Sequence, residues 1–138
     1  MTAHSHTDQP ALTKNQSLVY DALTDAKAPL SAYAILDGLR EHGIRAPLQV
    51  YRALDKLLEL GLVHRLESLN SFVACSNSEC GARETMVFAI CVKCNKVSEL
   101  ADDRLEAHLG ALAAADHFTV HAATVELRGI CGQCRSDA

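Results

Sequence analysis

The sequence predicts an α+β protein, and three features of the chain support this fold class. The amino-terminal half holds three short segments with helical spacing of apolar residues, a pair of short apolar strands follows, and two Cys-x-x-Cys motifs lie near the carboxyl end. A chain of 138 residues suffices for one ordinary domain or two small ones. We therefore expect a helical unit at residues 1–75, a hinge at 76–84 and a small α/β unit at 85–138.

Each predicted helix of the first unit has a start or stop signal. Thr13 and Gln16 match a capping box, Ser31 can cap the second helix, and Pro47 fits the first turn of the third. Gly43 and Gly61 are placed to end the second and third helices. The apolar residues expected to face the core are Leu18, Val19, Ala22, Leu23, Ile35, Leu36, Leu39, Val50, Leu54, Leu57 and Leu58.

Residues 62–66 and 72–75 are predicted to form a two-stranded hairpin around a polar turn at 68–71. Three helices followed by such a hairpin indicate a winged helix-turn-helix, whose third helix enters the major groove of DNA. The residues expected on or beside the exposed face of the third helix are Gln49, Arg52, Ala53 and Lys56, with Arg45 ahead of it and Arg65 in the hairpin. Gln and Arg side chains can contact bases, and Lys or Arg can meet phosphates. An ordinary solvated helix face has a similar composition, so the residues alone leave both interpretations open.

The second unit is predicted to contain two strands, a helix and a last strand. Strands at 85–91 and 96–100 flank the first Cys-x-x-Cys motif, Asp103 is expected to open a helix, and the last strand is expected from Thr119 to Arg128. Leu105, Leu109 and Leu112 should share one face of the helix. So small a unit is marginally stable alone, and we expect it to pair with a second copy through its sheet.

The two Cys-x-x-Cys motifs offer four thiolates, which is a donor set that tetrahedral Zn²⁺ prefers. They are Cys91, Cys94, Cys131 and Cys134. Four sulfur ligands leave no position for water, so such a site is structural rather than catalytic. The alternative is a pair of redox or disulfide motifs, but a thioredoxin-type motif normally occurs once, at the start of a helix.

Several protein classes are disfavoured by composition. The chain shows neither an export signal nor an apolar run of membrane-spanning length, so we expect a cytoplasmic protein whose six cysteines are reduced. The net charge of −4 argues against a general nucleic-acid binder, although it says nothing about a local basic patch. No convincing acid-base or nucleophile set is present, and we therefore do not expect an enzyme.

Most of the chain, from Lys14 to Cys134, resembles the ferric uptake regulator family and is most similar to its zinc uptake regulator branch. The resemblance lies in residues 31–37, 50–55, 60–67 and 70–75 and in the paired cysteine motifs. It implies a winged helix that binds operator DNA, a dimerising carboxyl-terminal domain and structural zinc on the four cysteines. It also implies DNA contacts by Tyr33 and Arg52. The full set of expected DNA-binding residues is Tyr33, Arg45, Gln49, Tyr51, Arg52, Lys56 and Arg65.

The same resemblance implies a second, regulatory metal site at the hinge. Its ligands would be His64, Cys75, Glu84 and Glu99, although zinc-sensing relatives have His where this chain has Glu84. Cys80 is an alternative fourth ligand, because it lies in the same segment and is a softer donor. One nitrogen, one sulfur and two oxygens can still enclose Zn²⁺, and the thiolate disfavours Mn²⁺ and, less strongly, Fe²⁺.

These features together predict a zinc-responsive transcriptional repressor of zinc-uptake genes, with two Zn²⁺ per subunit of a homodimer. Zinc at the hinge would lock the two DNA-binding domains at operator spacing, and without it those domains would swing freely. The alternatives are a sensor of iron, manganese, nickel or peroxide-linked iron on the same fold, and a zinc-ribbon module that binds protein instead of DNA.

Overall fold

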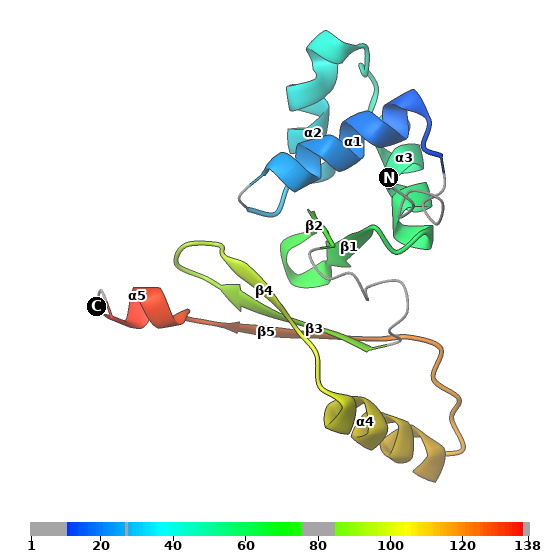
Figure 1. Cartoon of the computed structure of the whole chain (residues 1–138), viewed down its shortest axis with the longest axis vertical. Helices are drawn as coiled ribbons and strands as arrows, with labels where there is room; N and C mark the ends of the chain where they lie inside the picture. Colours follow the sequence, from blue (N-terminus) through cyan, green and yellow to red (C-terminus); the bar gives the residue numbers. More distant parts are fainter. Residues whose placement is uncertain (1–10, 27, 76–84, 137–138) are drawn as a thin grey trace, which may run out of the picture.

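Figure 1 shows the protein as a computed structural model, in which a helical unit stands above a small sheet and a last helix extends from the sheet. The structure describes residues 11–26, 28–75 and 85–136. None of the described helices has both the length and the apolar character needed to span a membrane. The elements are α1 (Lys14–Asp25), α2 (Ala32–Leu39), η2 (Arg40–His42), α3 (Pro47–Glu59), β1 (Val63–Leu66), η3 (Glu67–Leu69), β2 (Ser71–Ala74), β3 (Thr85–Cys91), β4 (Val97–Leu100), α4 (Asp103–Ala115), β5 (Ala123–Gly129) and α5 (Gly132–Ser136).

The predicted helix signals of the first unit are confirmed. The Thr13 hydroxyl accepts the Gln16 N–H at 3.2 Å, and the Gln16 side-chain oxygen accepts the Thr13 N–H at 3.0 Å. Ser31 caps α2 by accepting the Ala34 N–H at 3.1 Å. Helix α2 ends at Leu39 rather than directly before Gly43, and Gly43 instead caps the 3-10 turn η2 that follows. Gly43 has a φ of 98°, a left-handed conformation that glycine adopts without steric cost. The starts of α1 and α2 thus depend on local interactions.

The three helices enclose the larger of two hydrophobic cores. Val19, Ile35, Val50 and Leu57 are almost completely buried in it, as predicted from their helical spacing. The placement of Ala53 on the exposed face was wrong, because this residue is only 3% exposed. Helix α1 packs against α3, and the small side chain of alanine permits this close approach.

The wing is a two-stranded antiparallel sheet in which His64 lies opposite Val73. Its β2 strand is also joined to the helical unit. The Leu30 N–H donates to the Phe72 carbonyl at 3.0 Å, and the Phe72 N–H donates to the Leu30 carbonyl at 2.8 Å. The wing is therefore fixed to the segment that links α1 and α2.

The carboxyl-terminal sheet has the strand order β4-β3-β5, with β4 antiparallel and β5 parallel to β3. Strand β3 has the predicted bounds. The last strand begins at Ala123 rather than Thr119, because residues after a left-handed His117 (φ 57°) connect α4 to the sheet. The cap of α4 is Asp102 rather than Asp103, since the Asp102 carboxylate accepts the Arg104 N–H at 2.9 Å.

Burial within the second unit is concentrated on its central strand. Among the described residues beyond the hinge, only β3 contributes buried residues, and α4 contributes none. Leu112 of the predicted apolar helix face is 64% exposed. The large hydrophobic residues exposed in this unit are Val92, Leu100, Leu112, Phe118, Leu127 and Ile130.

Candidate metal centres and nucleic-acid interface

The strand order brings the two cysteine motifs together. Cys91 ends β3 and Cys94 lies in the turn to β4, whereas Cys131 follows β5 and Cys134 belongs to α5. Because β5 runs parallel to β3, with Cys91 opposite Gly129, the carboxyl ends of both strands lie at the same end of the sheet. The four sulfur atoms all lie within 4.8 Å of one another.

The distances between these sulfur atoms fit a tetrahedral metal site. Cys91 Sγ lies 3.7 Å from Cys134 Sγ, and Cys94 Sγ lies 3.8 Å from Cys131 Sγ. Four Zn–S bonds of about 2.3 Å at tetrahedral angles place the sulfurs about 3.8 Å apart. The four residues are thiols rather than disulfides, so this cluster can hold Zn²⁺ with little rearrangement.

Backbone N–H groups donate hydrogen bonds to two of the sulfur atoms and so stabilise their ionised form. The Cys131 N–H donates to Cys91 Sγ at 3.4 Å, and this bond is the main reason that the pKa of Cys91 is lowered to about 6. In contrast, hydrogen bonding to Cys131 raises the pKa of Cys134 to about 12. Four adjacent thiolates repel one another, so full ionisation requires a bound cation.

A second potential ligand cluster joins the wing to the carboxyl-terminal sheet. Ligand atoms of His64, Cys75 and Glu99 all lie within 4.8 Å of one another. His64 is on β1, Cys75 directly follows β2, and Glu99 is on β4. The Cys75 N–H donates to the Leu62 carbonyl at 2.8 Å, which fixes the backbone at the end of the wing. The two other candidates, Glu84 and Cys80, lie outside the described residues.

The His64 side chain has a buried ring nitrogen and a protonation state that suit metal binding. Its Nε2 is buried and, within the described part of the chain, is the one buried side-chain nitrogen or oxygen without a hydrogen-bond partner. Burial lowers the pKa of His64, although the nearby Glu99 charge acts in the opposite direction. The imidazole is therefore neutral near pH 7, and neutral imidazole is the form that binds metal. The ring also packs on Phe88, with centroids 5.3 Å apart.

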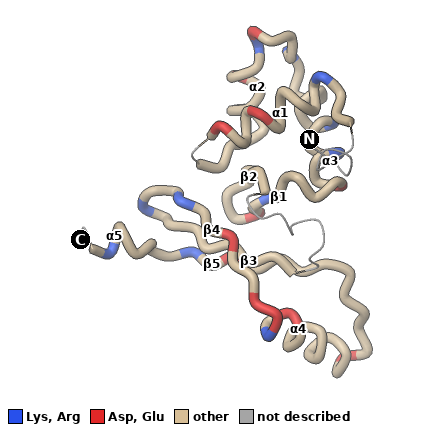
Figure 2. Tube along the Cα trace, in the orientation of Figure 1, with Lys and Arg blue, Asp and Glu red and all other residues tan. Residues whose placement is uncertain are grey.

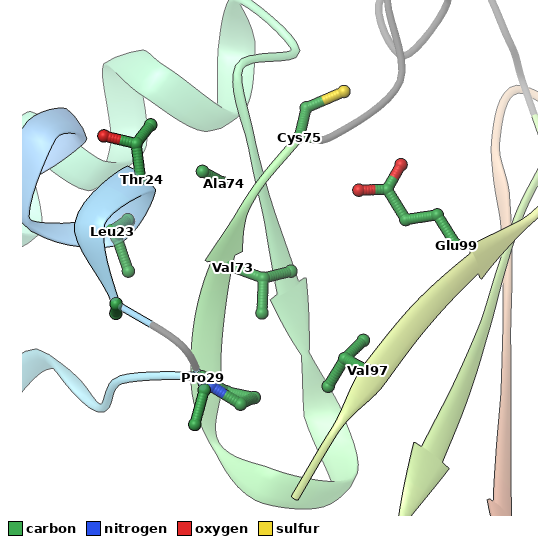
Figure 3. A pocket seen from close by; sticks show the side chains of 10 residues that line it. Leu23, Thr24, Pro29, Val73, Ala74, Cys75, Val97 and Glu99 are labelled. Atoms are coloured by element: carbon green, nitrogen blue, oxygen red, sulfur yellow. The ribbon is translucent and has the colours of Figure 1, made fainter. Parts of the chain in front are cut away.

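Figure 3 shows Cys75 and Glu99 projecting toward the same space. Both residues line a cavity of about 330 Å³. Its other lining residues include Leu23, Pro29 and Val73 of the first unit and Val97 of the second, so its walls come from both units of the chain. Cys75 is disulfide-bonded in the structure, so the prediction that all six cysteines are reduced is wrong for this residue. A zinc ligand must be a thiolate, so metal binding at this cluster requires reduced Cys75.

The candidate DNA-binding residues lie on the outside of the helical unit. Figure 2 shows basic residues near α3 and β1. Tyr33 is 63% and Tyr51 42% exposed. The basic side chains Arg45, Arg52, Lys56 and Arg65 are also exposed.

Three of these candidates have intramolecular partners. The Gln49 side-chain oxygen accepts the N–H groups of Arg45 and Ala46 at 2.9 and 3.0 Å, so it caps α3. Lys56 lies 3.5 Å from Glu59, and Arg65 donates to Asn70 at 3.2 Å. The Gln49 oxygen is thus already used, and only its amide N–H groups remain for a base.

Sequence reasoning missed three residues that the structure places in or beside these sites. Leu48 is 56% exposed at the start of α3, Phe88 packs against His64, and Glu126 of β5 contacts the wing. Leu48 was detectable, since it lies outside the apolar stripe of its helix. No local pattern marks Phe88 or Glu126, because their partners are distant in the sequence.

The chain is similar in sequence to known regulators. The model of the ferric uptake regulator family matches residues 11–128. The zinc uptake regulation protein of Escherichia coli (strain K12) is 41% identical over 106 residues, and that of Shigella flexneri has the same identity. The match covers 76% of this chain but only 61% of each relative.

Two solved structures are similar over nearly the whole chain. One, described as holo XcZur, has a TM-score of 0.84 at 38% identity and covers 95% of this chain and 91% of its own. The other, a zinc uptake regulator complexed with zinc and DNA, has a TM-score of 0.87 at 34% identity. It covers 96% of this chain and 88% of its own.

Proposed function

Because the chain belongs to the ferric uptake regulator family, we propose that it is a zinc-responsive transcriptional repressor rather than an enzyme. Its similarity to zinc uptake regulation proteins, and to a regulator solved with zinc and DNA, supports this assignment. The observation that carries the proposal is the cluster of His64, Cys75 and Glu99. A buried, unpartnered imidazole nitrogen beside a sulfur and a carboxylate is a donor set suited to Zn²⁺.

The ligand cluster would transmit the metal signal by joining two parts of the chain. His64 and Cys75 belong to the wing, and Glu99 belongs to the carboxyl-terminal sheet. When bound, Zn²⁺ would supply a positive charge that holds all three ligands in place. The three residues then favour one arrangement of the winged helix relative to the sheet, and DNA binding follows by a population shift. We propose Glu84 as the fourth ligand and Cys80 as its alternative.

A second zinc is proposed for Cys91, Cys94, Cys131 and Cys134, which gives two per subunit. This site would be structural, since four thiolates leave no open position. We further propose that the DNA-binding domain comprises residues 1–75, that 76–84 form the hinge and that 85–138 form the dimerisation domain. The protein would act in the cytoplasm on genes for zinc uptake.

Operator recognition is proposed for the exposed residues of α2, α3 and the wing. Arg52 can form paired hydrogen bonds to guanine, and Tyr33, Tyr51, Arg45, Lys56 and Arg65 can contact bases or phosphates. Gln49 would contribute mainly by capping the recognition helix, because its oxygen binds the Arg45 and Ala46 N–H groups. In a symmetric dimer the two α3 helices would meet half-sites about one helical turn apart.

Homodimerisation is supported by the exposed apolar side chains of the second unit. Strand β5 is an edge of the sheet, and Leu127 on it is 51% exposed. Leu112 of α4 and Phe118 beyond it are each 64% exposed. An edge strand with one free side, together with a helix that has no buried residues, is suited to association with a second copy of the chain.

The Leu112→Glu variant should weaken the dimer, since it places a charge on the proposed interface. We expect the dimer dissociation constant to rise by about tenfold or more, as measured by sedimentation equilibrium. Ala114→Glu is the matched control, because Ala114 is exposed and points about 200° away around the helix. Equal dissociation constants for both variants would place the dimer interface elsewhere.

The function is tested by titrating Zn²⁺ into reduced, metal-depleted dimer while binding to genomic DNA fragments is followed. Mn²⁺, Fe²⁺ and Ni²⁺ are titrated in parallel. We expect tight DNA binding to require about one zinc per chain beyond the structural zinc, and Arg52→Ala to lose about tenfold or more in affinity. Arg135→Ala, which removes an exposed charge from α5, is the matched control.

The outcomes of this titration separate the possible functions. Binding that follows iron, manganese or nickel would keep the fold and assign a different sensor. Absence of DNA binding with every metal would contradict the repressor proposal and favour a module that binds protein.

A further inference from the structure

The face of the sheet that receives the wing carries two carboxylates on either side of Phe88. In the strand register, Phe88 lies opposite Glu99 of β4 and opposite Glu126 of β5. Directly paired residues on adjacent strands point to the same face of a sheet. Glu99 belongs to the candidate metal cluster, and the His64 ring packs on Phe88. Glu126 is therefore the third member of one row facing the wing.

Glu126 binds the turn of the wing with both of its carboxylate oxygens. Its Oε2 accepts the Glu67 N–H at 2.7 Å, and its Oε1 accepts the Ser68 N–H at 3.0 Å. Hydrogen bonds from N–H groups to an ionised carboxylate are stronger than those between neutral groups. This contact joins β5 to η3 and involves neither cysteines nor histidine.

The Glu126 carboxylate is held in its ionised form by this contact. Burial alone acts to raise the pKa of Glu126, but hydrogen bonds from Ser68 and Glu67, together with the Arg128 charge, lower it below its usual range. The side chain thus remains an acceptor at neutral pH.

The conformation of the turn that Glu126 binds is also stabilised by interactions within the turn. Asn70 has a left-handed φ of 48°, and its N–H donates to the Glu67 carbonyl at 3.2 Å. Arg65 lies 3.7 Å from the Glu67 carboxylate and donates to the Asn70 side chain at 3.2 Å. These interactions hold the turn in the conformation in which the Glu67 and Ser68 N–H groups both reach Glu126.

An apolar contact lies beneath the two carboxylates. The second hydrophobic core combines Leu66 of the wing with Met86, Phe88 and Ile90 of β3. Leu66 is completely buried and Phe88 is 1% exposed. The wing and the sheet thus share a core, with the metal ligands on the Glu99 side and the backbone contact on the Glu126 side.

We propose that Glu126 is a metal-independent positioning residue that holds the wing on the sheet and so lowers the zinc concentration needed for DNA binding. The proposal rests on the repressor function given above. Because the chain is similar to a holo regulator and to one bound to zinc and DNA, the docked wing corresponds to the DNA-competent arrangement. Glu126 would raise the population of this arrangement before zinc binds. A smaller change in population would then be left for zinc to bring about.

The contact itself is tested in reduced protein with only its structural zinc, by NMR hydrogen exchange. We expect the Glu67 and Ser68 amides to be protected, and Glu126→Gln and Glu126→Ala to increase their exchange by about tenfold. Asp116→Asn is the matched control, since it removes a charge from an exposed residue after α4. Zinc content and the far-ultraviolet spectrum confirm that each variant is folded. Unprotected Glu67 and Ser68 amides in the unchanged chain would overturn the contact.

The effect on regulation is tested by zinc-dependent DNA binding of the same variants. For both Glu126 variants we expect half-maximal DNA binding at about tenfold higher free zinc, with the same DNA affinity once zinc is saturating. An unchanged or lower zinc requirement would overturn the positioning role. Failure of the unchanged chain to bind DNA would instead contradict the repressor function, and the exchange measurement would still test the contact.

Discussion

Replacing Cys131 with serine is expected to unfold the carboxyl-terminal unit and abolish the dimer. Among the described residues of this unit only β3 is buried, so its core is small. The four sulfurs lie at distances that match a zinc site, and binding of structural zinc contributes about 10–16 kcal/mol to folding in small zinc domains. Loss of one thiolate removes much of this stabilisation, and the small core cannot replace it.

Zinc content, circular dichroism and sedimentation measure this result. Cys131→Ser should lose the tightly bound zinc, part of the strand signal and the dimer. Cys75→Ser, compared in reduced protein, is the matched control, because it removes a sulfur outside this cluster and should retain all three properties. A Cys131→Ser dimer with unchanged thermal stability would contradict a structural role for the metal.

Replacing His64 with alanine is expected to abolish the zinc response while leaving the fold and the dimer intact. The variant removes the buried Nε2 that has no partner and leaves Cys75 and Glu99 as an incomplete ligand set. Coupling between two sites is typically about 1–3 kcal/mol, or about 5- to 150-fold in affinity. We therefore expect DNA binding at a fixed, limiting zinc concentration to weaken within this range.

The measurement is DNA affinity against free zinc, with zinc content per chain determined on the same samples. His64→Ala should retain one zinc per chain and lose the second. His42→Ala is the matched control, because His42 is an exposed histidine of the same unit that lies outside the cluster. A zinc response equal to that of the unchanged chain would exclude His64 as a ligand.

Elements with local signals were predicted well from the sequence. The caps of α1 and α2 and the start of α3 at Pro47 depend on residues within one turn of each helix end. Strand β3 was predicted with its observed bounds, because an apolar run from Met86 leads into the first cysteine motif at Cys91. Errors occurred where tertiary packing determines the burial of a residue or the bounds of an element. Ala53 is buried in the core of the helical unit, and the start of β5 depends on where the chain meets β3.

The amino-acid sequence by itself determined the amino-terminal caps of α1 and α2, the spacing within each cysteine motif and the candidate ligands. These properties depend on neighbouring residues and on the chemistry of single side chains. Only the tertiary structure decided which distant residues meet. The parallel pairing of β3 and β5 brings the four sulfurs together, and docking of the wing places His64 on Phe88 and the Glu67 and Ser68 amides on Glu126. Long-range contacts follow from the packing of whole elements. Short sequence patterns indicated that the four cysteines meet, but they carried no information about the contacts of Phe88 or Glu126.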